Sequence, residues 1–172
     1  MFFLSVHIIK RTLLTQRTFY AIIGGEKELN DMLTINATDV RKNWSEVSDS
    51  VIRERPRFIK RTRDYMMLSN LELMNDLLSA YTFTADKYTE ADGSITLSLN
   101  EIDLLENAET EAKAKERLAA AILEYAYEYY NDYKTYSAAP NRKSHIPYVF
   151  KAIILDDTAR IGECIQCRDG RN

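Results

Sequence analysis

The chain has 172 residues, of which 45% are apolar and 28% are charged, and its formal net charge is −3. These are ordinary values for a globular protein, and the length allows one domain or two small ones. No run of about 18 apolar residues occurs, so we expect no membrane span. The two cysteines, Cys164 and Cys167, lie too close together to staple a fold. Such sparse cysteine usage fits a protein of the reducing cytoplasm.

Residues 1–31 do not match a secretory signal, because Lys10 and Arg11 interrupt the apolar stretch and no small-residue cleavage site follows it. The codons of Lys27–Glu28 can form a purine tract resembling a ribosome-binding site shortly before Met32. We therefore expect residues 1–31 to be a non-native upstream extension or a disordered segment, with Met32 as the initiator.

Residues 32–80 predict a first domain with the order β-α-β-β-α. Asn36 or Thr38 can cap the first helix, and Pro56 ends it. The expected apolar face of that helix consists of Val40, Trp44, Val47, Val51 and Ile52. A tight turn at Arg63–Asp64 is expected to join the two later strands. The strands and the second helix are expected over 33–35, 58–62, 65–69 and 71–81.

Residues 81–172 predict a β-hairpin followed by helices, so the chain as a whole belongs to the α+β class. Asp92–Gly93 is a hairpin signal, and the strand after it alternates cleanly between apolar and polar residues. A long helix is expected over 111–136, with an apolar stripe of Leu118, Ile122, Tyr125, Tyr129, Tyr133 and Tyr136. Pro147 can open a short helix to Leu155, and Asp156 or Asp157 can cap another that ends near Cys167.

The charge is unevenly placed. Residues 32–80 carry 8 Lys and Arg against 7 Asp and Glu, whereas residues 81–139 carry 5 against 12. Six cations fall within eleven positions, against a single Glu54: Arg53, Arg55, Arg57, Lys60, Arg61 and Arg63. Such a run often only faces solvent, but a basic patch in an acidic chain also fits contact with the phosphates of DNA. Arg41 and Lys42 add cations near a helix start, where they oppose the helix dipole.

Three motifs follow one another along this domain: Thr38, Asp39, Arg41, Asn43 and Ser45 at the helix start, Lys60–Arg61 at a strand end, and Leu68–Ser69 at the next strand end. In order, spacing and residue type, these motifs resemble those of the prevent-host-death (Phd/YefM) antitoxins. The short connection between the two strands lacks the family's customary glycine. The resemblance implies a homodimer whose paired first domains bind operator DNA, while the C-terminal region neutralises a toxin.

Carried over residue by residue, the resemblance implies that Arg41 and Arg61 reach the bases or the groove, with Thr38 beside them. Lys42, Lys60 and Arg63 are then expected to contact phosphates. Family habit suggests either a RelE-like or a Doc-like toxin, and the acidic remainder is compatible with covering a basic, RNA-cleaving surface.

A tyrosine-rich helix is the second feature. Its rings mainly predict a core stripe, but Tyr127 and Tyr130 leave that stripe, and exposed tyrosine suits a protein interface. We expect Tyr127, Tyr130 and Tyr133 to contact the toxin. Residues 82–136 also faintly resemble the half-fold of HicB antitoxins, which implies a folded toxin-binding region.

Catalytic and metal chemistry find little support. Cys164 and Cys167 supply two of the four ligands of a structural zinc, and His145 is the only histidine near them, so two thiols on a terminal helix are expected. No phosphate-binding glycine loop or nucleophile motif occurs, and neither a cofactor nor an enzymatic activity is expected.

The sequence favours an antitoxin that represses its own operon. The alternative is a transcriptional regulator without a toxin, using residues 81–172 for oligomerisation or sensing.

Overall fold

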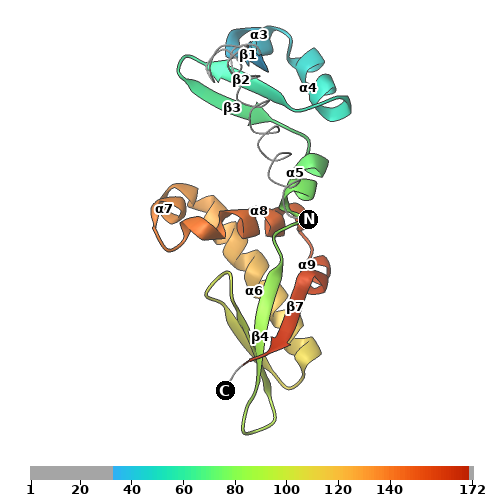
Figure 1. Ribbon diagram of the computed structural model, residues 1–172, viewed down its shortest axis with the longest axis vertical. Coiled ribbons are helices and arrows are strands. Elements are labelled where there is room, and N and C mark those ends of the chain that lie inside the picture. The colour runs from blue at the N-terminus through green and yellow to red at the C-terminus, as the bar shows by residue number, and fades with distance from the viewer. Residues whose placement is uncertain (1–32, 171–172) are drawn as a thin grey trace, which may run out of the picture. The chain divides into compact units, whose positions relative to one another are not determined.

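The structure is a computed structural model that describes residues 33–170. The hypothesis that Met32 is the initiator, and the assignment of residues 1–31, lie outside this range. The chain divides into two compact units, Met1–Asn70 and Leu71–Asn172, which we call the first and the second unit (Figure 1). Both mix helices and strands, which confirms the α+β class.

The described part of the first unit, residues 33–70, is a three-stranded sheet with two short helices. Its sheet order is β1-β2-β3, with β1 parallel to β2 and β2 antiparallel to β3. The buried side chains of Val40, Val47 and Ile59 form its small core. The elements are β1 (Thr34–Asn36), α3 (Ala37–Lys42), α4 (Trp44–Arg53), β2 (Arg57–Arg61) and β3 (Asp64–Leu68).

Two local predictions in this unit were wrong. The first helix is interrupted at Asn43, whose φ is −119°, so the stripe does not continue as one face: Trp44 is 55% exposed and Ile52 is 64% exposed. The hairpin turn lies one residue earlier than predicted, since Arg61 pairs with Asp64 and the loop is Thr62–Arg63. Thr62 adopts a positive φ of 57°, a conformation for which the family's glycine is better suited.

The second unit is a four-stranded sheet with helices, and its sheet order is β6-β5-β4-β7. The terminal strand β7 runs parallel to β4, whereas the other pairs are antiparallel. The elements are α5 (Leu71–Leu78), β4 (Phe83–Thr89), β5 (Ile95–Leu99), β6 (Leu105–Ala108), α6 (Glu111–Asn131), α7 (Tyr133–Ala138), the 3₁₀ turn η1 (Lys143–His145), α8 (Ile146–Leu155), α9 (Thr158–Cys164) and β7 (Ile165–Asp169).

Helix α6 lies at the centre of this unit and contacts β5, β6, α8 and α9. Thr110 caps it by accepting a hydrogen bond from the backbone of Lys113 at 3.3 Å. The predicted stripe is completed by three alanines that the sequence analysis did not single out, Ala114, Ala119 and Ala126. Small residues there let α8 and α9 approach closely, and the resulting core contains many more buried side chains than the core formed by residues 33–70.

The hairpin prediction was confirmed, because Gly93 has a φ of +84° in the turn and Leu97 and Leu99 face the core. The long helix, however, ends at Asn131, and the chain restarts as α7 after Asp132. The predicted helix ending near Cys167 was wrong as well: α9 ends at Cys164, and the next residues pair with β4 as strand β7. Asp157 caps α9 by accepting from Ala159 and Arg160.

Helix α5 was counted with the first domain in the sequence-based division at 80/81. In the structure it contacts α8, and Leu78 is only 8% exposed. This packing places the division of the chain between Asn70 and Leu71.

Candidate functional site

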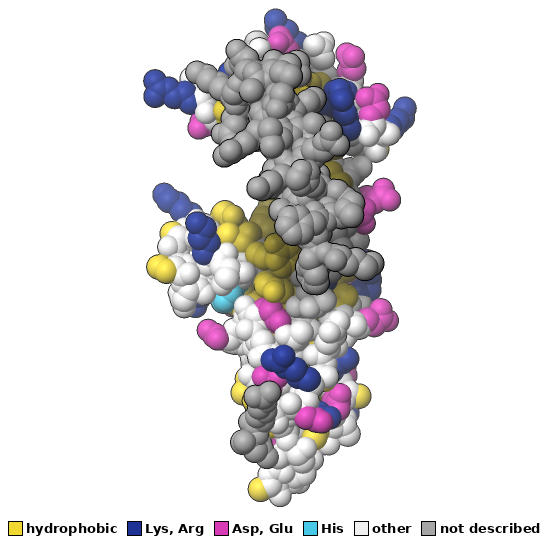
Figure 2. Space-filling view, in the orientation of Figure 1, with side chains coloured by type: hydrophobic (Ala, Val, Ile, Leu, Met, Phe, Trp, Pro, Cys, Tyr) yellow, Lys and Arg dark blue, Asp and Glu magenta, His cyan; other side chains and the backbone are white. Residues whose placement is uncertain are grey.

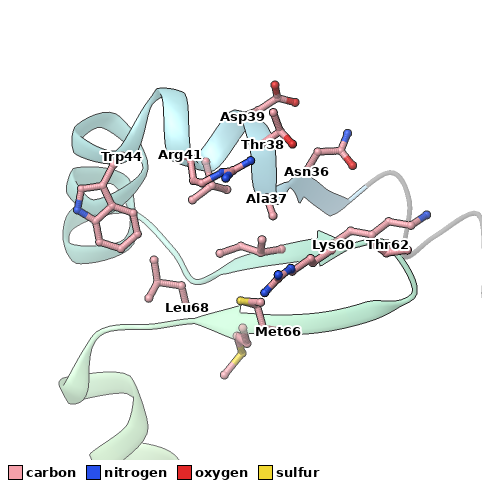
Figure 3. A pocket seen from close by; sticks show the side chains of 14 residues that line it. Asn36, Ala37, Thr38, Asp39, Arg41, Trp44, Lys60, Thr62, Met66 and Leu68 are labelled. Atoms are coloured by element: carbon pink, nitrogen blue, oxygen red, sulfur yellow. The ribbon is translucent and has the colours of Figure 1, made fainter.

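A groove of about 930 Å³ lies between helix α3 and the β2–β3 hairpin of the first unit (Figure 3). Four of the six residues predicted to contact DNA line it: Thr38 and Arg41 come from α3, and Lys60 and Arg61 come from β2. The first pair and the second are separated by α4 in the sequence. The parallel pairing of β1 with β2, with Asn36 opposite Lys60, places the start of α3 beside the end of β2.

The floor of this groove is apolar. Ile59 is 5% exposed, while Met66 and Met67 of β3 remain 48% and 44% exposed. Trp44, which the sequence analysis assigned to the core, also lines the groove (Figure 3). The signal that could have corrected this assignment is Asn43, a poor helix former directly before the tryptophan.

The remaining two predicted contacts lie elsewhere on the first unit. Lys42 is the last residue of α3 and Arg63 lies in the hairpin turn, and both are exposed. Neither lines the groove. Exposed cations beyond a groove can still reach the phosphates of a long polyanion, which extends well past the bases that are read.

Arg57 belongs to the basic run in the sequence but has a structural task. Its Nε donates to the hydroxyl of Ser50 at 2.8 Å, and one terminal nitrogen lies 3.2 Å from a carboxylate oxygen of Glu54. These contacts join α4 to β2.

The ammonium of Lys60 lies 5.7 Å from the ring centroid of Tyr65, an arrangement that holds the cation beside β3.

Electrostatics distinguish the two units. Residues 33–70 contain 8 Lys and Arg against 5 Asp and Glu, whereas residues 71–170 contain 10 against 18. The groove of the first unit therefore offers cations over an apolar floor, a composition suited to a phosphate-bearing ligand. Within residues 33–170, no group of three or more His, Cys, Asp or Glu side chains is placed to hold a metal ion.

The tyrosines of α6 and α7 separate into buried and exposed sets. Tyr129 is fully buried, and its hydroxyl donates to the carbonyl of Arg142 at 3.0 Å. The three predicted toxin contacts are all exposed: Tyr127 by 42%, Tyr130 by 54% and Tyr133 by 40%. The assignment of Tyr133 to the core stripe was wrong, because the helix breaks at Asp132 immediately before it.

Phe150 of α8 and Asp156, which follows α8, contact this exposed set, although the sequence analysis assigned neither of them to it. The ring of Phe150 meets Tyr130 and Tyr133 edge to face, with centroids 6.2 Å and 6.1 Å away. The hydroxyl of Tyr127 donates to the carboxylate of Asp156, which follows α8. Apolar and tyrosine side chains gather over α8 on the visible face of the second unit (Figure 2).

The two cysteines do not share a terminal helix as expected. Cys164 ends α9, whereas Cys167 lies within β7, where burial raises the pKa of its thiol. A raised pKa keeps the thiol protonated and weakly reactive.

In the part of the chain that the structure describes, no helix has the length and apolarity needed to cross a membrane.

Comparison with known proteins gives the family. The family model described as "PHD_like: Antitoxin of toxin-antitoxin, RelE / RelB, TA system" matches residues 32–167. Among solved structures, the chain is similar to the antitoxin part proposed for a toxin/antitoxin system from Syntrophomonas wolfei subsp. wolfei. The identity is 34%, the TM-score is 0.76, and the match covers 80% of this chain and 99% of that one. No curated protein matches the chain. The chain belongs to the PHD-like family of antitoxins of toxin–antitoxin systems, and membership of this family implies that its partner is a toxin.

Proposed function

We propose that this antitoxin binds the operator of its own operon as a homodimer through the first unit, in the manner of Phd/YefM antitoxins. The observation that carries the proposal is the groove between α3 and the hairpin. It brings Arg41 and Arg61, the two residues expected to read DNA, to one surface although they are distant in sequence. The guanidinium groups of two arginines can grip guanine edges or phosphates with paired hydrogen bonds.

Dimerisation is supported by apolar side chains on the surface of the same unit. Outside the groove, the exposed large apolar residues of this unit include Leu33, Ile52, Phe58 and Tyr65. Monomeric proteins rarely expose so many in so small a unit, and a two-fold dimer would bury a self-complementary patch. Such a dimer would double every DNA contact and read a palindromic operator.

Neutralisation of the toxin is assigned to the second unit. This region forms a folded sheet with helices, as the resemblance to the HicB half-fold implies. The description of the matching family names RelE / RelB, which favours a RelE-like toxin over a Doc-like one. The protein then acts in the cytoplasm by stoichiometric occlusion rather than by catalysis. Family membership also favours this function over that of a regulator without a toxin.

A gel-shift titration on the DNA upstream of the operon tests the DNA-binding role. Arg61→Ala is expected to weaken binding by roughly 1–3 kcal/mol, because one arginine contact per protomer is lost. Lys134→Ala serves as the matched control, since this cation is exposed on α7 of the second unit and should leave the midpoint unchanged. An Arg61→Ala midpoint equal to that of the wild type would contradict the assignment.

A further inference from the structure

Three exposed tyrosines of the second unit, together with the partly buried Phe150 that contacts two of them, form a feature that we call the tyrosine face: Tyr127, Tyr130, Tyr133 and Phe150. The edge-to-face contacts of Phe150 with two of these rings hold them in place, and the hydrogen bond to Asp156 holds Tyr127. Rigid rings lose little conformational entropy when a partner binds, so they are effective contacts in interfaces.

Three carboxylates adjoin this face along α6. Glu124, Glu128 and Asp132 follow one another at intervals of four residues, and all three are exposed. On a helix this spacing aligns their side chains in one row. Glu124 lies one turn before Tyr127, with residues three apart on the same side of the helix. Glu124 and Tyr127 therefore lie side by side, whereas Tyr130, two residues from both Glu128 and Asp132, lies on the flank of α6 that contacts Phe150.

Among the described residues of the second unit, four carboxylates form ion pairs with a cation, whereas these three, like most of the others, do not. Asp86 pairs with Arg168, Glu109 with Lys113, and Lys87 with both Glu111 and Asp169. Within residues 33–170, no Lys or Arg lies within ion-pair distance of Glu124, Glu128 or Asp132.

The position of the row on the helix adds to its electrostatic cost. Like charges four residues apart repel one another, and carboxylates near a helix C-terminus oppose the helix dipole. The last turn of α6 contains no basic residue that could offset this. The free protein thus carries unfavourable negative charge beside exposed aromatic rings, and a cationic partner would relieve it.

From this combination we propose that the tyrosine face and its carboxylate row dock a cationic surface of the toxin. The carboxylates pair with Lys or Arg side chains of that surface. The rings of Tyr127 and Tyr130 pack on the aliphatic stems and guanidinium planes of its arginines. The inference deepens the proposed toxin neutralisation and rests on it, because it names the contact region and the chemistry of the partner surface.

The test uses the full-length antitoxin and the protein encoded by the adjacent reading frame, with affinity measured by calorimetry at two salt concentrations. Glu128→Lys is expected to weaken binding at least about tenfold at low salt, and less at high salt where charge is screened. Tyr130→Ala should weaken binding at least about tenfold at both salt concentrations, since it removes a buried aromatic contact.

Glu163→Lys is the matched control. It makes the same charge reversal on α9, where Glu163 is exposed and outside the tyrosine face, and it should bind like the wild type. If the wild type binds and both Glu128→Lys and Tyr130→Ala bind equally well, the docking face is wrong while toxin binding stands. Equal weakening by Glu163→Lys would reduce the effect to net charge and also overturn the face. Absence of wild-type binding would overturn the proposed function itself.

Discussion

The Nδ1 atom of His145 lies 2.7 Å from the hydroxyl oxygen of Tyr125 in the interior of the second unit. His145 is 7% exposed, and this burial lowers its pKa, with Arg142 acting in the same direction and Asp103 opposing it. The lowered pKa favours the neutral form of this imidazole, which lies at the end of the 3₁₀ turn and contacts Tyr125 of α6. Because His145 directly precedes α8, its protonation state is coupled to the stability of that helix.

We predict that the second unit loses stability as the pH falls below about 6.5, the ordinary pKa of histidine. In the window between that value and the lower pKa of folded His145, the unfolded chain binds a proton that the folded chain does not, so the free energy of unfolding decreases with falling pH. Below the folded pKa the loss levels off. Denaturant titrations at several pH values measure this slope.

A His145→Asn variant is the control for that prediction, since it keeps a polar group but removes the titration. Its free energy of unfolding should be lower overall and should lack the decrease specific to the histidine window. Carboxylate titrations, such as that of Asp86 with its pKa lowered by Arg168, affect both proteins alike. Parallel pH profiles for the two proteins would exclude His145 as the cause.

Tyr129→Phe is predicted to lower the free energy of unfolding by about 1–2 kcal/mol, because the carbonyl of Arg142 loses its buried donor. Tyr130→Phe is the neighbouring control. Its side chain is 54% exposed, so loss of this hydroxyl should change the stability by less than about 0.5 kcal/mol. Thermal and denaturant unfolding of the two variants measure the difference, and equal losses would contradict the assigned roles.

The sequence predicted the elements that local pattern alone can specify. The alternation of Ile95, Leu97 and Leu99 and the turn at Gly93 identified the hairpin, and the Leu118–Ile122–Tyr129 spacing identified α6. Strand β7 was not predictable in this way, because Ile165–Asp169 becomes a strand only by pairing with β4, far away in the sequence. The breaks at Asn43 and Asp132 were also missed. The apolar residues on both sides of each break have the spacing of one continuous helix, so the pattern gave no sign of an interruption.

The site was predictable where residues lie on adjacent elements with fixed register. Thr38, Arg41, Lys60 and Arg61 meet because β1 pairs with β2 in parallel, and the family resemblance grouped these four residues as DNA contacts without specifying that pairing. By contrast, Arg57 was grouped with the exposed cations because sequence shows its charge but not its bonds to Ser50 and Glu54. The contribution of Phe150 to the tyrosine face depends on how α8 packs against α6, which no local pattern encodes.

Gly170→Ala is predicted to loosen the end of strand β7. A Cβ atom at Gly170 would lie 2.3 Å from the ring of Tyr88, so the ring must move away from the chain. The backbone N–H of Gly170 donates to the carbonyl of Lys87 at 2.9 Å. Because the clash involves the residue that follows Lys87, we expect this hydrogen bond to open more often in the variant. Hydrogen exchange of the β7 amides should be faster than in the wild type. A Gly93→Ala variant would not reproduce this, because no atom lies within 4 Å of its Cβ position.

Ile59→Ala is predicted to destabilise the first unit by about 2–5 kcal/mol, through lost burial and a cavity that the small core cannot close. Ile59 is 5% exposed and packs with Val40 and Val47, and it directly precedes Lys60 and Arg61 on β2. The variant should therefore lose operator affinity as well as protection of the β2 amides from hydrogen exchange. Ile59→Val, which removes one methylene, should cost only about 0.5–1.5 kcal/mol and retain DNA binding. Full operator binding by Ile59→Ala would show that the β2 cations do not depend on this core for their placement.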